Sequence, residues 1–177
     1  MTLEESSARC GGHCWIERRV FELLGAWGAS AGAAGVVVLL DRHSQHAAWR
    51  AGQWWERLPV RAGLDREALV VPPSGWGEAL GAAGEHRPAP AGGDPGLLAV
   101  THRVVLPRLS ARYRDHAGRA GPVADAPVLR TLGLAAGDVR VDWEEGEVGL
   151  QELLVDRESL AVASKAAREA EAAFVVG

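Results

Sequence analysis

The sequence predicts an all-α protein: a four-helix bundle with a long crossover between helices 2 and 3 and an extra C-terminal helix. Three observations predict this fold class. Apolar side chains recur every three or four residues over long stretches, which is the period of an amphipathic helix. No stretch beyond short valine runs carries a strand signal. The connections between the long helical patterns are short, very long and short, as expected of two antiparallel hairpins joined by a crossover.

The first helix is expected over residues 3–27, where apolar side chains form one continuous stripe. The Gly11-Gly12 pair weakens its early turns, because glycine is a poor helix former, so the firm part should begin near His13. A patch rich in glycine and alanine, residues 28–35, predicts a tight turn to the second helix.

The second helix is expected over residues 33–58, and Pro59 ends it because proline cannot continue the hydrogen-bond ladder. A crossover rich in proline and glycine follows over residues 59–96. It contains one short helix, predicted over residues 74–83, and the stretch 86–96 is expected to be a loop.

The third helix is expected over residues 97–118, with a kink at Pro107. The fourth is expected over residues 125–155, where Pro127 is tolerable because it falls in the first turn. A last amphipathic helix, residues 157–175, is expected to dock on the bundle or on a second subunit. The predicted domains are therefore a bundle over 1–155 and a C-terminal amphipathic helix over 156–177.

Composition restricts the function. A chain of 177 residues suits one domain, and 47% hydrophobic with 24% charged residues is typical of a globular protein. The net charge of −4 provides no basic surplus for nucleic acid, and the longest apolar run is far shorter than the roughly 20 residues of a membrane span. The polar N-terminus has no signal-peptide pattern. We therefore expect a soluble cytoplasmic protein, in which Cys10 and Cys14 are small buried hydrophobic residues rather than a disulfide.

The strings RCGGHCWIERRVFELLGAW, HSQHAAWRAGQWWERLP and DWEEGEVGLQ, together with the helix pattern over residues 3–155, resemble an actinobacterial branch of the ferritin-like superfamily. The resemblance implies a bundle whose interior derives from a di-iron site. Such a site needs a Glu-x-x-His from each of two helices, and this chain contains none. Val139 and Asp142 stand at that position on the fourth helix, so the di-iron ligands are degenerate.

Inward-facing polar residues define the candidate site. If the first hairpin turns near residue 30, Glu17 and His43 are level in the bundle, and so are His13 and His46. This places three imidazoles and a carboxylate in one interior layer, with a guanidinium just below. The stretch 133–137 on the fourth helix consists of small residues and predicts either close helix contact or room for a ligand.

Two kinds of chemistry suit these residues. A buried carboxylate beside histidines has a perturbed pKa and can transfer protons near neutral pH, which makes Glu17, His43 and His46 candidate catalytic residues without a cofactor. The same three could instead hold one iron or manganese ion, although the positive charge of Arg50 disfavours two cations. The candidate substrate-binding residues are His13, Arg50, Trp54, His102, Arg112, Tyr113, His116 and Asp142.

Simpler roles compete with these. Inward histidines are often hydrogen-bonded core residues, and Arg50 can simply pair with Glu17. Trp49, Trp54 and Trp55 point in three directions and cannot line one pocket. Glu144, Glu145 and Glu147 are expected to form a solvated face.

Three functions follow from the sequence. The first is a small-molecule enzyme of bacterial specialised metabolism that catalyses a cyclisation, elimination or rearrangement by acid–base chemistry. The second is a non-haem iron or manganese oxidase or oxygenase. The third is a non-catalytic binding or partner subunit, which could pair through the C-terminal helix.

Overall fold

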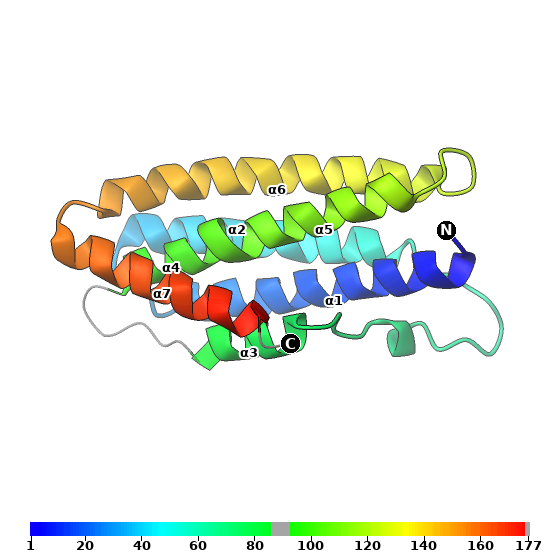
Figure 1. Cartoon of the computed structure of the whole chain (residues 1–177), viewed down its shortest axis with the longest axis horizontal. Coiled ribbons are helices and arrows are strands. Elements are labelled where there is room, and N and C mark those ends of the chain that lie inside the picture. The colour runs from blue at the N-terminus through cyan, green and yellow to red at the C-terminus, as the bar shows by residue number, and fades with distance from the viewer. Residues whose placement is uncertain (86–92, 176–177) are drawn as a thin grey trace.

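The fold is a bundle of helices in a computed structural model that describes residues 1–85 and 93–175 (Figure 1). Every regular element in these two ranges is helical, and no strand occurs in them. The all-α prediction is therefore confirmed for the described residues.

The first hairpin consists of α1 (Leu3–Gly28) and α2 (Ala34–Trp55), which run antiparallel (Figure 1). A capping box begins α1: the Thr2 hydroxyl accepts from the Glu5 amide at 3.1 Å, and the Glu5 carboxylate accepts from the Thr2 amide at 2.7 Å. The second helix ends four residues before Pro59. Both helices agree with their predicted bounds to within three residues.

The Gly11-Gly12 pair lies within α1 and gives the crossover room to approach it. A Cβ atom on Gly11 would lie 1.9 Å from the carbonyl oxygen of Leu69, and one on Gly12 would lie 2.9 Å from Pro73 Cγ. The expectation of a firm helix only from His13 is wrong, since α1 is continuous from its cap. Tertiary packing overrides the low helix propensity of glycine here.

The crossover has more helix than predicted. It contains a short 3₁₀ turn, η1 (Glu67–Leu69), and α3 (Trp76–Glu85), which corresponds to the predicted helix over 74–83. Of the expected loop over 86–96, residues 86–92 lie outside the described residues. Its last three residues are helical, because α4 (Asp94–Ala99) begins there, so this part of the loop prediction is wrong. Pro95 falls in the first turn of α4, where a missing amide costs no hydrogen bond.

One continuous helix follows, in which α4 leads through a π-helical segment, η2 (Val100–Val105), into α5 (Leu106–Arg119). The wide turn accommodates Pro107, whose ring would otherwise meet the carbonyl group four residues earlier. The Leu106 amide donates to the carbonyl oxygen of Thr101, five residues back, as a π-turn requires. The helix therefore continues through the proline.

The last long helix of the bundle, α6 (Ala126–Leu153), has Pro127 in its first turn as predicted. Its small stretch 133–137 contains one fully buried residue, Ala135, which belongs to the apolar core. Gly133 and Gly137 are exposed, and no neighbouring atom lies within 4 Å of a Cβ placed on either. Ala135 therefore packs in the core, whereas the two glycines of the stretch contact no other helix.

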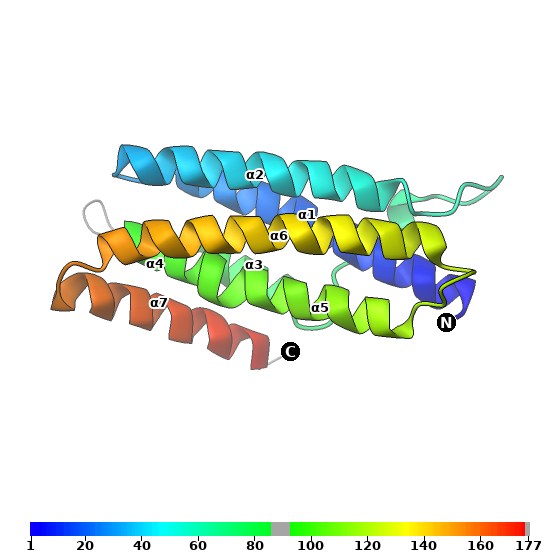
Figure 2. The same ribbon diagram turned by 90° about the horizontal axis from the view of Figure 1, so that it is seen from above.

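The C-terminal helix α7 (Arg157–Val175) packs on the bundle against α3, α4 and η2, as Figures 1 and 2 show. The ring of Phe174 meets the ring of Trp76 edge-on at 5.0 Å, and the Arg108 guanidinium lies 4.4 Å from the Phe174 ring centre. Docking on the bundle agrees with the sequence analysis.

Cys10 and Cys14 belong to the apolar core, which is built mainly from leucine, valine and alanine. Both thiols are free and buried, and burial raises the pKa of Cys10 to about 12. They are therefore unreactive core residues, as predicted. None of the described helices is both long and apolar enough to cross a membrane.

Asp94 ties the beginning of α4 to the beginning of α2. Its carboxylate accepts from the amides of Gly32 at 3.0 Å and Ala33 at 2.7 Å, next to the positive end of the α2 dipole. Asp94→Ala is expected to lower the free energy of unfolding by about 1–2 kcal/mol, measured by urea denaturation. The exposed Asp41 provides the control: Asp41→Ala should change it by less than about 0.5 kcal/mol. Equal losses in the two variants would contradict the capping role.

Candidate functional site

The two helices of the first hairpin pair in a different register from the predicted one. The Cys14 thiol donates to the carbonyl oxygen of Ala51 at 3.5 Å, and the Ser44 hydroxyl donates to that of Phe21 at 2.9 Å. The midpoint of 14 and 51, and of 21 and 44, is 32.5. The hairpin therefore turns two to three residues later than residue 30, which shifts the pairing by about five residues.

The predicted layer, with Glu17 level with His43 and His13 level with His46, is wrong for this reason. Glu17 lies against Arg50 instead, nearly two turns along α2 from His43. A shift of five residues exceeds one helical turn, so it places the same inward residues in contact with different partners.

Arg50 is the centre of the buried polar network. Its Nε donates to Glu17 Oε1 at 2.7 Å, and its Nη1 donates to Asp138 Oδ2 at 2.6 Å and Asp142 Oδ2 at 2.7 Å. The side chains of Arg50, Glu17 and Asp142 are fully buried. Burial alone would lower the pKa of Arg50, but the carboxylates, with Glu17 first among them, raise it well above its usual value. One guanidinium thus donates to three carboxylates, one from α1 and two from α6, and its single positive charge offsets only part of their negative charge.

Glu17 is enclosed by protein donors. Its Oε1 also accepts from the Tyr113 hydroxyl at 2.5 Å, and that hydroxyl accepts from Trp54 Nε1 at 3.0 Å. Burial raises the pKa of Glu17, while Arg50 opposes the rise. Burial together with the charge of Glu17 raises the pKa of Tyr113 well above its usual value. The described contacts of Glu17 therefore position Arg50.

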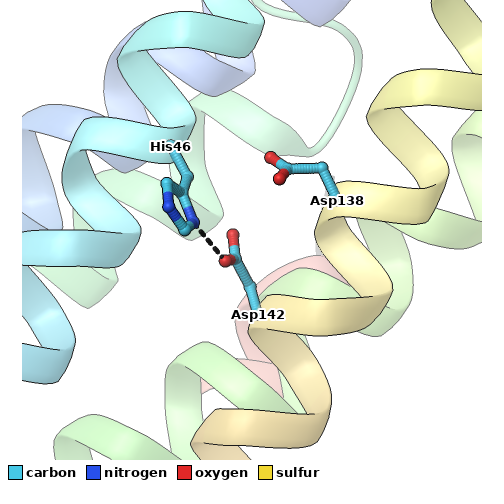
Figure 3. Close-up of side chains that lie close together, drawn as sticks. All are labelled: His46, Asp138 and Asp142. Carbon is cyan, nitrogen blue, oxygen red and sulfur yellow. Dashed lines mark hydrogen bonds and ion pairs between the residues drawn. The ribbon is translucent and has the colours of Figure 1, made fainter.

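His46 and Asp142 form a dyad in which α2 supplies the imidazole and α6 the carboxylate (Figure 3). His46 Nδ1 lies 2.6 Å from Asp142 Oδ1, and the other Asp142 oxygen accepts from Arg50. Because a carboxylate only accepts, Nδ1 carries the proton and Nε2 presents its lone pair in the neutral ring. The His46 side chain is 35% exposed, so this end of the network is open to solvent.

A chain of hydrogen bonds assigns the tautomers of two buried histidines. His102 Nδ1 lies 2.9 Å from the carbonyl oxygen of Leu98 and must donate to it, so His102 Nε2 accepts from His43 Nδ1 at 3.1 Å. Burial lowers the pKa of His102 to about 3, and it also lowers the pKa of His43. His43 Nε2 lies 3.3 Å from Glu145 Oε2. Because Nδ1 donates to His102, Nε2 holds the lone pair of the neutral His43 ring. It carries a proton only in the imidazolium form, which the carboxylates of Asp142 and Glu145 favour and burial opposes.

Gly146 makes room for His102 between α6 and η2. A Cβ on Gly146 would lie 1.9 Å from His102 Cδ2 and 2.1 Å from His102 Nε2. The imidazole therefore lies directly against the α6 backbone, in the wide turn of the π-helical segment.

A second pair of imidazoles lies away from Arg50. His13 Nε2 is 3.0 Å from His116 Nδ1, and both side chains are fully buried. The His13 ring packs on Trp54 at 4.6 Å and meets Tyr113 edge-on at 4.8 Å. Burial lowers the pKa of His13 well below its usual value and that of His116 to about 4, so both rings are neutral. Arg112 lies one turn before His116 on α5 and is partly exposed.

The three tryptophans of α2 separate as predicted. Trp54 is buried beside His13, Trp49 is 48% exposed, and Trp55 stacks with Arg66, whose guanidinium lies 4.3 Å from a Trp55 ring. Only Trp54 therefore contacts the predicted site residues described above.

Two surface hollows lie outside the polar network. One, of about 240 Å³, is lined by residues of α5 and α6: Leu106, Pro107, Ser110, Arg114, Val139, Arg140 and Trp143. The other, of about 290 Å³, lies over α1 and α2 and is lined by Arg18, Phe21, Ala48, Ala51, Gly52 and Trp55. Neither includes a predicted catalytic or substrate-binding residue.

Two members of the network were missed by the sequence analysis. Asp138 precedes Asp142 by one turn, which is the only signal in the sequence that could have drawn attention to it. Glu145 was predicted only as part of a solvated face, and its contact with His43 was missed. Its carboxylate accepts from Arg42 at 2.7 Å and contacts His43, although it is 38% exposed.

A di-iron centre does not fit this donor set. The described metal-ligating groups that converge are His46, Asp138 and Asp142, whose ligand atoms lie within 4.8 Å of one another, rather than Glu17, His43 and His46 (Figure 3). Both aspartates already accept from the same Arg50 nitrogen. The guanidinium supplies one positive charge where two further cations would have to lie, which disfavours them.

No protein-family model matches the chain, and searches of curated proteins and of solved structures find no significant match. The function is therefore argued from the geometry of the network alone.

Proposed function

We propose that this protein catalyses a proton-transfer reaction on a small molecule without a cofactor, with His46 as the general base. The supporting observation is the His46–Asp142 contact of 2.6 Å, with Asp142 held in turn by Arg50 and with His46 partly exposed. A carboxylate on Nδ1 fixes the tautomer in which Nε2 accepts a proton, and it stabilises the imidazolium that results.

The proton donor in this proposal is the imidazolium form of His43, which Asp142 and Glu145 stabilise against the cost of burial. His43 lies next to the base: the rings of His43 and His46 are 6.0 Å apart, and His43 Nε2 is 3.7 Å from the same Asp142 oxygen that His46 contacts. His46 Nε2 removes a proton from the substrate, and the His43 imidazolium returns one to the leaving group or to a carbonyl oxygen. This base–acid pair suits a cyclisation, an elimination or a rearrangement.

Arg50 and Glu17 act as positioning residues in this proposal. Arg50 orients Asp142, and Glu17 with Tyr113 orients Arg50. This proposal gives Glu17 a supporting role rather than the catalytic one expected of it, because its side chain is fully buried and its Oε1 accepts from both Arg50 and Tyr113.

Hydrolysis of p-nitrophenyl acetate tests the reactivity of His46 Nε2, because an accessible neutral imidazole attacks this ester as a nucleophile. His46→Ala is expected to remove most of the rate above the uncatalysed background, since His13, His43, His102 and His116 are buried. Asp142→Asn is expected to lower it as well, because an amide cannot hold His46 in the same tautomer. The control is Gln45→Ala, an exposed neighbour on α2.

The proposal fails if His46→Ala and Gln45→Ala hydrolyse the ester at the same rate. Long-range proton–nitrogen NMR spectra provide a readout that a loss of stability would not move. They should show His46 protonated on Nδ1 in the parent protein, and the proton should move to Nε2 in part of the Asp142→Asn population.

A second candidate is chemistry at one bound divalent cation, held by His46, Asp138 and Asp142. Two carboxylates and one imidazole are suitable ligands for iron or manganese. Calorimetric titration with Mn²⁺ separates the candidates: about one ion per chain, lost in Asp138→Asn, would favour the metal, and no heat of binding would favour the cofactor-free base.

We also propose the ferritin-like architecture for the chain over residues 3–155. Two hairpins, α1–α2 and α5–α6, joined by a long connection support it.

A further inference from the structure

Arg112 carries a positive charge that has no ion-pair partner of its own among the described residues. Its guanidinium has no hydrogen bond or ion pair within the described residues, and its Nε is buried without a partner. Arg112 Nη2 would lie 3.1 Å from a Cβ on Gly12, so the guanidinium lies against the backbone of α1. A partly buried cation without a counter-charge is costly, which is why such groups are normally paired.

The neighbouring carboxylate is already shared. Asp115 accepts from Arg9 at 2.8 Å and from Arg119 at 3.0 Å, so two guanidinium groups use it before Arg112. Three arginines thus surround one aspartate at this end of α5. Burial, followed by the positive charge of Arg9, lowers the pKa of Arg112.

The buried imidazole pair supplies a second unsatisfied donor. If His13 Nε2 donates to His116 Nδ1, then His116 Nε2 carries a proton; if the direction is reversed, His13 Nδ1 carries one. Neither outer nitrogen has a partner among the described residues. One buried N–H therefore lacks an acceptor in either arrangement, and such a group normally indicates a bound water or ion.

We propose that Arg112, with Arg9 and the His13–His116 pair, binds a small oxyanion between α1 and α5. The guanidinium fork matches the paired oxygens of a phosphate or carboxylate. Arg112 lies close enough to His13 for its charge to lower the pKa of that ring, so an unpartnered imidazole N–H can add a further donor. Arg112 is partly exposed, which leaves a route from solvent. The site does not depend on the proposed chemistry at His46 and Asp142, which lie on α2 and α6.

Calorimetric titration with sodium phosphate and, separately, with sodium acetate tests the site at constant ionic strength set with sodium chloride. The parent protein is expected to bind about one phosphate per chain. Arg112→Gln should weaken binding at least tenfold, and Arg114→Gln, an exposed arginine on the same helix, should leave it unchanged. Because the substitution removes an unpaired charge, Arg112→Gln should melt no lower than the parent without phosphate.

Binding of phosphate alone would identify a phosphate-type ligand, and comparable binding of acetate would identify a carboxylate. The His116 Cε1 proton signal should shift on binding in either case. No heat with either anion, or equal binding by Arg112→Gln and the parent, would overturn the site while leaving the ester-hydrolysis test of His46 unaffected.

Discussion

Arg50→Ala is expected to lower the free energy of unfolding by about 3–5 kcal/mol, because it leaves buried carboxylates without their cation. Glu17 and Asp142 are both fully buried, and each accepts a hydrogen bond from Arg50 at 2.7 Å. Urea denaturation at neutral pH measures the loss. The expected change is large because removing one partner exposes the full cost of burying the others, rather than the small net value of the ion pair.

Two further variants show whether the position or merely the charge matters. Arg140→Ala removes an exposed arginine that pairs with Glu144 and should cost less than about 0.5 kcal/mol. Arg50→Lys keeps the charge, but a lysine ammonium lacks the planar fork that lets Arg50 donate to Glu17 on α1 and to Asp142 on α6 at once. The stability of this variant should therefore fall between those of the parent and Arg50→Ala. If Arg50→Ala were no less stable than Arg140→Ala, the network would not have the central role that its geometry indicates.

Gly146→Ala is expected to destabilise the fold by about 2 kcal/mol, the usual cost of overpacking a core. The added methyl group would occupy the place of the His102 ring, 1.9 Å from its Cδ2. His102 is hydrogen-bonded to His43 and to the Leu98 carbonyl, so moving it breaks two buried contacts. Thermal and urea denaturation measure the loss, and the tautomer signals of the two histidines in NMR spectra should change with it.

Gly137→Ala is the matched control on the same helix. Gly137 is exposed, and no neighbouring atom lies within 4 Å of a Cβ placed there. Alanine should therefore stabilise the protein by up to about 1 kcal/mol through its better helix propensity. A loss of stability in Gly146→Ala together with a gain in Gly137→Ala would support the packing of His102 against Gly146. A gain of stability in both variants would contradict it.

The helices and their buried faces were predictable because both follow from local patterns. The spacing of apolar residues places α1, α2 and α7 within three residues of their observed ends. The same spacing identifies the inward polar residues: Glu17 and Asp142, for example, are completely buried. Periodicity reports which side of a helix faces the core, and this is a property of each helix alone.

The partners within the core were not predictable, because they depend on the relative shift of the helices. A turn centred two to three residues later than expected places Glu17 against Arg50 instead of His43. The π-helical segment before Pro107 also changes which side chains face inward on either side of it, relative to a regular α-helix. No spacing rule in the sequence reveals this segment. Gly146 carries no signal either, since the reason for a glycine there lies in the imidazole of another helix.

The link from Asp94 to the beginning of α2 also has a consequence for folding kinetics. Asp94 is 61 and 62 residues away in sequence from the two amides that it binds. These two contacts at the turn of the first hairpin therefore form only after α4 has docked beside it. The loop-closure entropy of so distant a contact must be overcome before the contact contributes to stability. The two hairpins should accordingly fold as one cooperative unit, with the amides at the start of α2 among the last in the first hairpin to become protected from hydrogen exchange.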